Sequence, residues 1–196
     1  MSEEVYNRQS ELELDRSMSI SVIGTGGVGF WVAKFAAMSG IERIDLFDYD
    51  TIEESNLNRL DLPRRFINKN KAEVTKAFIL SIRPDCNVKS FPFKLQDITF
   101  NNTDWLIDCT DKYESQLENQ RIASIKGARY MKAGYDGESY SINNSVAEWG
   151  ESEDGYTVTP SWVVPSVLVA SLAVAKIMKY KNKEVHSNVK NTFRSL

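Results

Sequence analysis

The sequence contains few of the residue types on which several common site chemistries depend. Its 196 residues include one histidine, His186, and two cysteines, Cys86 and Cys109, which form no Cys-x-x-Cys pair. A multi-histidine metal site and a zinc ribbon are therefore excluded by count, and no zinc is expected. Two thiols are also too few for a disulfide framework, so we expect a reducing compartment, the cytoplasm.

The sequence also lacks an excess of basic residues and an apolar run of membrane-spanning length. With 24 basic and 27 acidic residues the formal net charge is −3, which gives no reason to expect nucleic acid as a ligand. The apolar stretch at residues 162–178 contains proline and lysine. It is shorter than the roughly 20 residues that a spanning helix needs. We expect a buried helix there and no membrane association.

The sequence does contain a regular alternation of strand-like and helix-like segments. Residues 19–23 form an apolar alternating strand that ends in a glycine loop, and helical spacing over 30–38 precedes a second strand at 41–47. Further expected elements are helices at 71–82, 113–126 and 162–180, and strands at 87–93, 104–108, 129–133 and 138–148.

This alternation predicts the fold class and the domain organisation. Strands that alternate with helices favour a single α/β domain with a doubly wound, mainly parallel, Rossmann-like sheet, whose late strands are antiparallel. We expect the domain to span residues 18–182. An N-terminal arm at 1–17 precedes it, and a polar C-terminal tail at 183–196 follows it.

The glycine loop is the first candidate site. It runs Gly24-Thr25-Gly26-Gly27-Val28-Gly29, between the first strand and the first helix. Glycines let the backbone turn tightly and approach a phosphate, and the helix N-terminus offers free N–H groups and a partial positive charge. The loop therefore predicts nucleotide binding, with a glycine-rich packing turn as the alternative.

A carboxylate follows the second strand at the position expected for a ribose contact. Asp48 lies 19 residues beyond Gly29, where a carboxylate can accept both hydroxyls of a ribose. ATP and NAD both carry an adenosine ribose, so this residue does not separate them. The alternative is an exposed acid at a strand end.

The segment that follows Asp48 separates the two nucleotides. Residues Asp48-Tyr-Asp-Thr-Ile-Glu-Glu-Ser-Asn-Leu-Asn-Arg59 resemble the ThiF/MoeB family, the adenylating domain of ubiquitin-activating enzymes. Further matches follow the family's order: Tyr6-Asn7-Arg8-Gln9 in the arm, Lys71 at a helix start, and Asp108-Cys109-Thr110-Asp111 after the fourth strand. With the final apolar helix, the resemblance extends from about residue 6 to about residue 180.

The resemblance implies a role for each matching residue. Asn56 and Arg59 would hold the ATP phosphates, and Lys71 would lie on the α-phosphate, where the transition state gains negative charge. Asp111 would bind Mg²⁺, a hard ion that takes oxygen ligands, and Asp50 would help through the metal or by positioning the loop. Arg8 would be an arginine finger that reaches into a partner's site, which implies a homodimer.

The implied activity is that of an ATP-dependent adenylyltransferase. Its substrate would be the C-terminal carboxylate of a ubiquitin-like or sulfur-carrier protein, or of a peptide. The chain departs from larger family members because it has no Cys-x-x-Cys pairs and no cysteine in the region 150–160, so we expect no thioester step. Lys112 and Gln116 also stand where the family often has asparagine and arginine.

Several alternatives stay open at this point. The acyl substrate could instead be a peptide or a small carboxylic acid. An NAD-dependent oxidoreductase would share the glycine loop and Asp48, but it would leave the segment from Ser55 to Arg59, and Lys71, without a purpose. The chain could also be a non-catalytic subunit of a heterodimer, although such subunits usually lose the phosphate-binding residues that are present here.

Overall fold

The structure, a computed structural model, describes residues 3–96, 101–136, 139–146, 160–179 and 187–189. The strands in these residues are β1 (Ser19–Ile23), β2 (Arg43–Phe47), β3 (Asn87–Phe91), β4 (Trp105–Asp108), β5 (Arg129–Tyr135), β6 (Tyr140–Asn143) and β7 (Ser187–Val189). The α-helices are α1 (Gly27–Met38), α2 (Lys71–Ile82), α3 (Tyr113–Lys126) and α4 (Val163–Lys179). Shorter 3₁₀ helices are η1 (Glu3–Leu12), η2 (Glu54–Asn56) and η3 (Arg64–Phe66).

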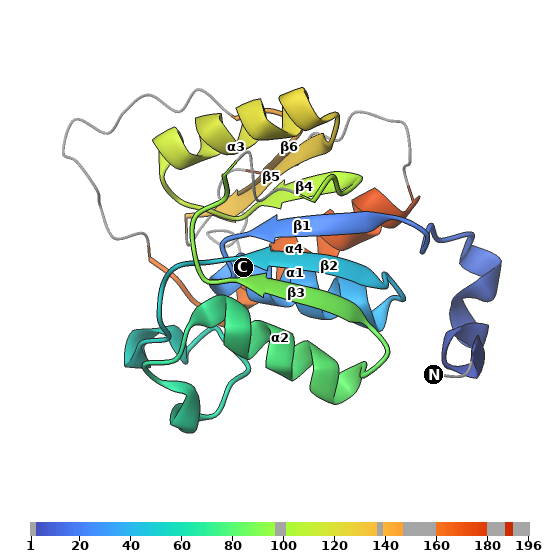
Figure 1. Cartoon of the computed structure of the whole chain (residues 1–196), viewed down its shortest axis with the longest axis horizontal. Helices are drawn as coiled ribbons and strands as arrows, with labels where there is room; N and C mark the ends of the chain where they lie inside the picture. Colours follow the sequence, from blue (N-terminus) through green and yellow to red (C-terminus); the bar gives the residue numbers. More distant parts are fainter. Residues whose placement is uncertain (1–2, 97–100, 137–138, 147–159, 180–186, 190–196) are drawn as a thin grey trace.

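The described strands form one sheet in the order β3-β2-β1-β4-β5-β6-β7 (Figure 1). Strands β1 to β5 pair in parallel, whereas β6 and β7 pair antiparallel. The order reverses between β1 and β4, since the chain first adds β2 and β3 on one side of β1 and then returns to the other. The predicted doubly wound, mainly parallel sheet with antiparallel late strands is therefore confirmed.

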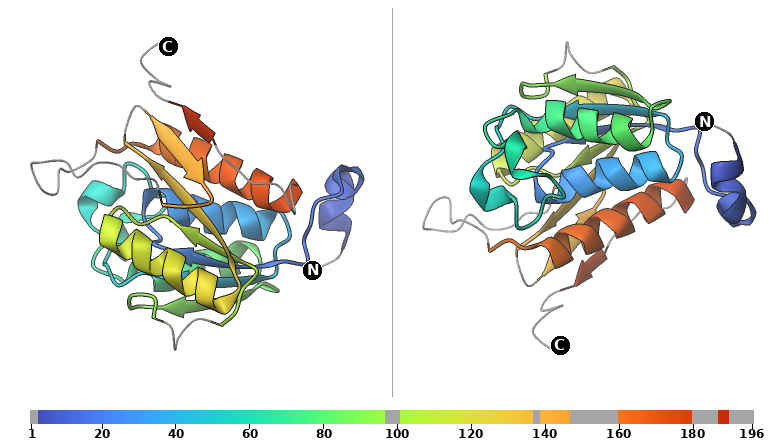
Figure 2. Two further views of the ribbon diagram at one scale, coloured as in Figure 1. Left: turned by 90° about the horizontal axis from the view of Figure 1, so that it is seen from above. Right: turned by 90° about the horizontal axis from the view of Figure 1, so that it is seen from below.

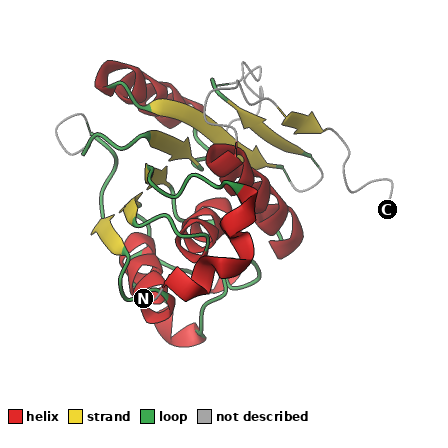
Figure 3. Cartoon of the chain, turned by 90° about the vertical axis from the view of Figure 1, so that its right-hand side faces the viewer, coloured by secondary structure: helices red, strands yellow, loops and turns green. Residues whose placement is uncertain are grey.

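Helices cover both faces of the sheet. Figure 2 shows α1, α2 and α4 side by side over one face and α3 over the other. Figure 3 shows the twist of the sheet between these layers. Strand β1 is buried along its whole length because both of its faces are covered. Its serines are satisfied inside the protein: Ser21 Oγ bonds Thr103 Oγ1 at 2.9 Å, and Ser19 Oγ donates to Asp104 at 2.7 Å.

The late strands differ from the boundaries expected from sequence. Strand β5 continues through Gly134 and Tyr135, where a turn was expected, because both residues pair with β6. Strand β6 is shorter than the expected segment 138–148, whose last residues, like most of the expected loop at 150–160, lie outside the described residues. In the segment expected to be a polar tail, Ser187–Val189 pair with β6 as β7. The domain boundaries themselves stay predictions.

The first and last helices bring the two ends of the domain together. Helix α1 begins at Gly27, three residues before the expected start at Phe30, because the N–H of Phe30 already donates to the carbonyl of Gly26 at 3.0 Å. Helix α4 packs along α1 and buries an apolar face there. Among the described residues, no helix is both long and apolar enough to span a bilayer.

Candidate functional site

The glycine loop leaves the carboxyl end of β1, where the strand order reverses. Gly24 has a φ of +81°, a left-handed conformation that favours glycine. A Cβ at Gly24 would also lie 3.2 Å from the backbone oxygen of Cys109. The N–H of Gly24 donates to the carbonyl of Phe47 at 2.8 Å, so the loop is tied to the ends of the neighbouring strands.

The other glycines of the motif have different surroundings. A Cβ on Gly29 would lie 1.8 Å from the carbonyl oxygen of Gly24, so Gly29 allows α1 to pack against the loop. A Cβ on Gly26 would meet no atom within 4 Å, and Gly26 lines the open cleft described below. Gly27 begins α1 between Arg59, Ser166 and Tyr135. Gly24, Gly26 and Gly27 therefore line the cleft, while Gly29 acts in packing.

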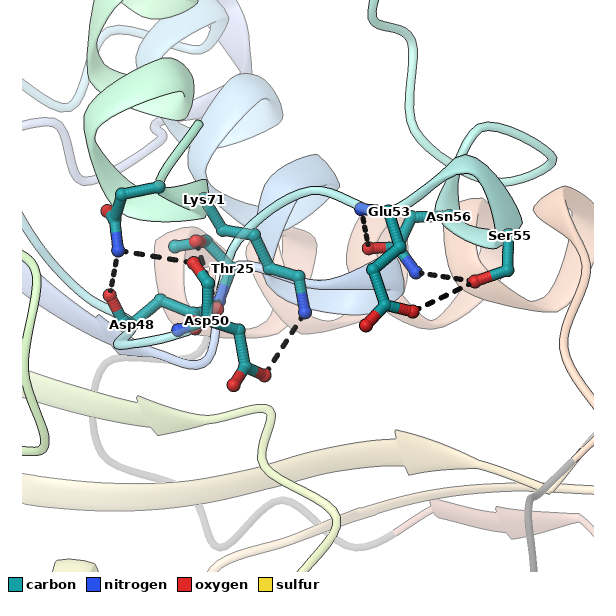
Figure 4. A network of polar contacts seen from close by, with 8 residues as sticks. Thr25, Asp48, Asp50, Glu53, Ser55, Asn56 and Lys71 are labelled. Carbon is teal, nitrogen blue, oxygen red and sulfur yellow. Dashed lines mark hydrogen bonds and ion pairs between the residues drawn. The ribbon is translucent and has the colours of Figure 1, made fainter. Parts of the chain in front are cut away.

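Asp48 joins the glycine loop to the end of β2 (Figure 4). Its Oδ2 accepts from the backbone N–H of Thr25 at 2.7 Å and from the Thr25 hydroxyl at 3.2 Å. Its Oδ1 accepts from the N–H of Asp50 at 2.9 Å. Burial raises the pKa of Asp48 above its ordinary value, against the lowering effect of these amide hydrogen bonds and of Lys71. A carboxylate has about four acceptor positions, so acceptor capacity remains for a ligand hydroxyl.

Lys71 points into the same region from the first turn of α2. Its Nζ forms an ion pair with Asp50 Oδ2 at 3.1 Å, and its side chain is only 14% exposed. Asn70 caps this helix by accepting from Glu73 N at 3.1 Å, and it donates to the carbonyl of Asp48 at 2.8 Å. A cation at a helix N-terminus opposes the helix dipole, so the position of Lys71 suits an anion in the cleft rather than the helix itself.

Asn56 and Arg59 lie in the loop between β2 and α2. Asn56 is buried, and its Oδ1 accepts from the N–H of Glu53 at 3.2 Å, which closes the turn of η2. Arg59 Nη1 donates to the carbonyl of Ser55 at 2.8 Å and to Asn58 Oδ1 at 2.9 Å. The carbonyl of Arg59 accepts from Trp31 Nε1 on α1, also at 2.8 Å, and so fixes the loop against that helix.

The end of β4 carries a buried polar network that sets the position of Asp111. Asp108 is fully buried, and its Oδ1 accepts from the N–H and the hydroxyl of Thr110, at 2.9 and 2.6 Å. Its Oδ2 accepts from Asn119 Nδ2 and from Tyr130 Oη. Asp108 is therefore structural, whereas Asp111 follows this turn with an exposed side chain that lines the cleft.

Both cysteines have suppressed thiolates. Burial raises the pKa of Cys109 to about 12 and that of Cys86 to about 11. Cys109 lines the cleft, but its thiol stays protonated at neutral pH because burial disfavours the thiolate. Arg83 beside Cys86 and Lys132 beside Cys109 lower these pKa values less than burial raises them, so neither thiol is a reactive nucleophile.

Arg8 lies outside this cleft. It is exposed on η1, which docks at the far end of α1: Gln9 Nε2 donates to the carbonyl of Ser39 at 2.8 Å. The buried ring of Tyr6 lies under the Arg16 guanidinium, 3.8 Å from its carbon. Figure 1 shows the arm at the edge of the sheet opposite to the carboxyl ends of β1 to β4. Arg8 is the one predicted site residue that belongs to another part of the surface.

The remaining predicted residues, Gly29 apart, surround one cleft of about 900 Å³ at the carboxyl ends of the parallel strands. They are Gly24, Gly26, Gly27, Asp48, Asp50, Asn56, Arg59, Lys71 and Asp111. Cations and carboxylates thus face one another around a glycine loop at the helix N-terminus, which is an arrangement suited to phosphate groups.

Sequence reasoning gave no role to Lys132 and Tyr135 of this cleft, and it singled out Gln116 only as a departure from the family pattern. Gln116 and Lys132 both donate to the carbonyl of Thr110, at 2.9 and 2.6 Å. Tyr135 Oη bonds Ser166 Oγ at 2.9 Å beside Gly27. Lys132 did leave a sequence signal, since it is the charged residue inside an otherwise apolar strand. The hydrogen bond between Tyr135 and Ser166 joins distant segments, so no local sequence pattern indicates it.

This fold and cleft define the class of Rossmann-like α/β domains with a glycine loop at the switch point of the sheet. A model of the ThiF family matches residues 5–196, and the chain belongs to this family. The resemblance inferred from the sequence motifs is thereby confirmed.

Curated relatives match parts of the chain. It is 27% identical to ubiquitin-like modifier-activating enzyme 5 of Oryza sativa subsp. japonica, over 77% of this chain and 40% of that protein. It is 46% identical to the NEDD8-activating enzyme E1 catalytic subunit of Dictyostelium discoideum, over 43% of this chain and 19% of that protein. The chain thus spans well under half the length of these relatives.

Solved structures share the fold. The chain superposes on E. coli MccB with a TM-score of 0.77 at 19% identity, over 97% of this chain and 70% of that one. It superposes on PaaA with a TM-score of 0.74 at 20% identity, over 96% of this chain and 73% of that one. At such identities the likeness concerns the fold.

Proposed function

We propose that this chain is an ATP-dependent adenylyltransferase that activates a C-terminal carboxylate as an acyl-adenylate. The observation that carries the proposal is the convergence of Lys71, Arg59 and Asp48 around the glycine loop in one cleft. Membership of the ThiF family and similarity to activating enzymes support it. An oxidoreductase would need no cations at these positions, so ATP is the nucleotide we expect.

Different residues of the cleft would bind the nucleotide and stabilise the transition state. Asp48 lies where a ribose would approach the end of β2, and the N–H groups of Gly26 and Gly27 open α1 toward phosphate oxygens. Arg59 and Lys71 supply positive charge from the loop and from α2. Such charge stabilises the extra negative charge that the α-phosphate gains when a carboxylate oxygen attacks it.

Magnesium belongs to the same proposal. Asp111 offers an exposed carboxylate at the rim of the cleft, which is the oxygen ligand that Mg²⁺ prefers. Among the described residues no cluster of three metal-ligating side chains occurs, so the protein would contribute little beyond Asp111. Mg²⁺ typically binds in this way, through one or two carboxylates together with phosphates and water, and it neutralises phosphate charge.

The acyl substrate would be a ubiquitin-like or sulfur-carrier protein, or a peptide with a free C-terminus. The curated relatives are named for ubiquitin-like modifiers and NEDD8, whereas structures of MccB contain the MccA peptide. Neither thiol of this chain is set up as a nucleophile, because the pKa of each is raised to about 11 or 12. We therefore propose that the acyl-adenylate passes to a separate sulfur or amine donor.

ATP–pyrophosphate exchange tests this proposal. The chain would be assayed with small proteins that end in Gly-Gly and with peptides of varied C-terminal residue, each as the free acid and as the amide. We expect exchange with one class of free acid, and a loss of about 10³-fold in Lys71→Ala, ~4 kcal/mol of transition-state stabilisation. Lys69→Ala, an exposed lysine outside the cleft, is the matched control and should retain activity.

Two results would count against the proposal. One is the absence of exchange with every free acid in the panel. The other is equal activity of Lys71→Ala and Lys69→Ala. Titration with ATP and NAD in parallel completes the test, since tighter binding of NAD would favour an oxidoreductase.

A further inference from the structure

A lysine that the roles above do not use lies in the row of residues at which the parallel strands end. Lys132 of β5 pairs with Asp108 of β4, and Asp108 pairs with Ile23 of β1, one residue before the glycine loop. Lys132 is 9% exposed and lines the cleft. Its ammonium lies 3.2 Å from the position of a Cβ on Gly134, so the missing side chain of that glycine leaves room for it.

The partners of this ammonium are dipoles and not charges. Nζ donates to the carbonyl of Thr110 at 2.6 Å and lies 3.5 Å from the carbonyl of Ala133. Lys71 differs, because it forms an ion pair with Asp50. In the part of the chain that the structure describes, Lys132 forms no such pair with a carboxylate. A nearly buried lysine that forms no direct ion pair is costly, and it suits a place where an anion binds.

The anion that Lys132 binds could be a phosphate of the nucleotide or the carboxylate of the acyl substrate, and the position of the lysine distinguishes the two. Asp48, at the end of β2, marks the side of β1 on which a ribose would bind, and Lys71 lies on that side too, in its ion pair with Asp50. Lys132 comes from β5, on the opposite side of β1 and two strands away from it, at a spacing of about 4.8 Å per strand. A nucleotide that extends from Asp48 to the glycine loop would present its α-phosphate between these two sides.

We propose that Lys132 binds the attacking carboxylate of the acyl substrate and holds it beside the loop of Asp111. This inference rests on the proposed function, because it names how that site receives its second substrate. A carboxylate oxygen forms a bond to the α-phosphorus, the bond from that phosphorus to the bridging oxygen breaks, and pyrophosphate leaves. No proton moves, so the ammonium of Lys132 stays charged throughout and offsets the charge of a carboxylate that must approach an anionic phosphate.

A binding measurement on the full chain tests the proposal without a known substrate. The probes are pentaglycine and its C-terminal amide, titrated into protein loaded with magnesium and the α,β-methylene analogue of ATP. We expect the acid to bind the native chain more tightly than the amide. Lys132→Met should weaken binding of the acid about tenfold, ~1.4 kcal/mol, while Lys132→Arg should keep the preference for the acid. The Kd of the nucleotide analogue should change less than about twofold.

Gln116→Leu provides the matched control. Gln116 also donates to the carbonyl of Thr110, so this variant removes a support of the same loop without removing a charge. We expect it to affect the acid and the amide alike. If it reproduces the effect of Lys132→Met, the lysine only supports the loop. The proposal is also overturned if pentaglycine fails to bind the native chain, if acid and amide bind equally, or if Lys132→Met mainly weakens the nucleotide.

The binding test of Lys132 and the exchange test of the proposed function can give negative results independently of each other. Selective binding of the acid without any exchange activity would support Lys132 as a carboxylate-binding residue and would contradict the proposed adenylation. Exchange activity that is unchanged in Lys132→Met would support the proposed adenylation and would contradict a role for the lysine.

Discussion

The glycines at positions 26 and 29 share one motif, but the structure places them in different environments. Gly29 faces the carbonyl of Gly24, and a Cβ there would lie 1.8 Å from that oxygen. Gly26 has open space where a Cβ would be added, on the side of the cleft. Gly29 is therefore needed for folding, whereas Gly26 leaves room for a ligand.

We therefore predict opposite effects for the two alanine variants. Gly29→Ala should lower the free energy of unfolding by about 3 kcal/mol, because α1 must move away from the loop. Gly26→Ala should leave stability nearly unchanged and weaken nucleotide binding. Urea unfolding and ATP titration of both variants provide the comparison. Equal stability of the two variants, or unaltered ATP binding by Gly26→Ala, would contradict this assignment.

At the residue scale, the sequence was sufficient to predict a site residue where that residue acts through the backbone next to it. The glycine loop, Asp48 and Lys71 sit at strand and helix ends whose positions follow from local patterns, and the structure brings them together. Lys132 was missed, and Gln116 was noted only as a departure from the family pattern, because the role of each depends on Thr110, which lies 22 and 6 residues away and which both bind. A linear pattern does not show which carbonyl a side chain reaches.

At the scale of elements, helix boundaries were predicted well where a cap marks them. Helices α2 and α3 begin and end at the expected residues, since Asn70 caps the first and Gly127 ends the second with a φ of +71°. The boundary between β5 and β6 was wrong because Gly134 indicates a turn locally, yet its backbone pairs with Ser141 across the sheet. Tertiary pairing thus overrode the local signal.

Asn70 links two elements of the site and predicts a measurable loss. It caps α2 through Glu73 N and donates to the carbonyls of Asp48 and Asp50. Asn70→Ala should cost about 2 kcal/mol of stability, because the cap and these bonds are lost together. Ser81→Ala, an exposed position near the other end of α2, is the control and should change stability little. Stability would be measured by thermal unfolding. Equal melting temperatures of both variants and the native chain would contradict the stabilising role of Asn70.

At the scale of the whole molecule, the N-terminal arm lies opposite to the carboxyl ends of the parallel strands (Figure 1), and the residues that line the cleft lie at those carboxyl ends. Arg8 therefore lies far from the cleft of its own chain, and we propose that it acts on the cleft of a second copy. Two-fold symmetry would place each arm at the partner's cleft, and the same contact would form twice. The predicted homodimer follows from this proposal.

Mixing two inactive variants tests the exchange of arms. Arg8→Ala and Lys71→Ala should each be inactive alone. After subunit exchange, a mixed dimer carries one site with both residues, so about a quarter of the native activity should return. Light scattering of the native chain should give the mass of a dimer. A monomer, an active Arg8→Ala variant, or a mixture that stays inactive would contradict the proposal.

The most direct test of the whole account is the identity of the nucleotide products. ATP labelled on its α- and γ-phosphates would be incubated with the chain, Mg²⁺, hydroxylamine as an acyl trap, and the panel of free acids and amides. Attack on the α-phosphate predicts AMP and pyrophosphate in equal amounts, together with an acyl hydroxamate, and only with a free acid. ADP and inorganic phosphate, or the same cleavage with acids and amides, would contradict adenylation at this cleft.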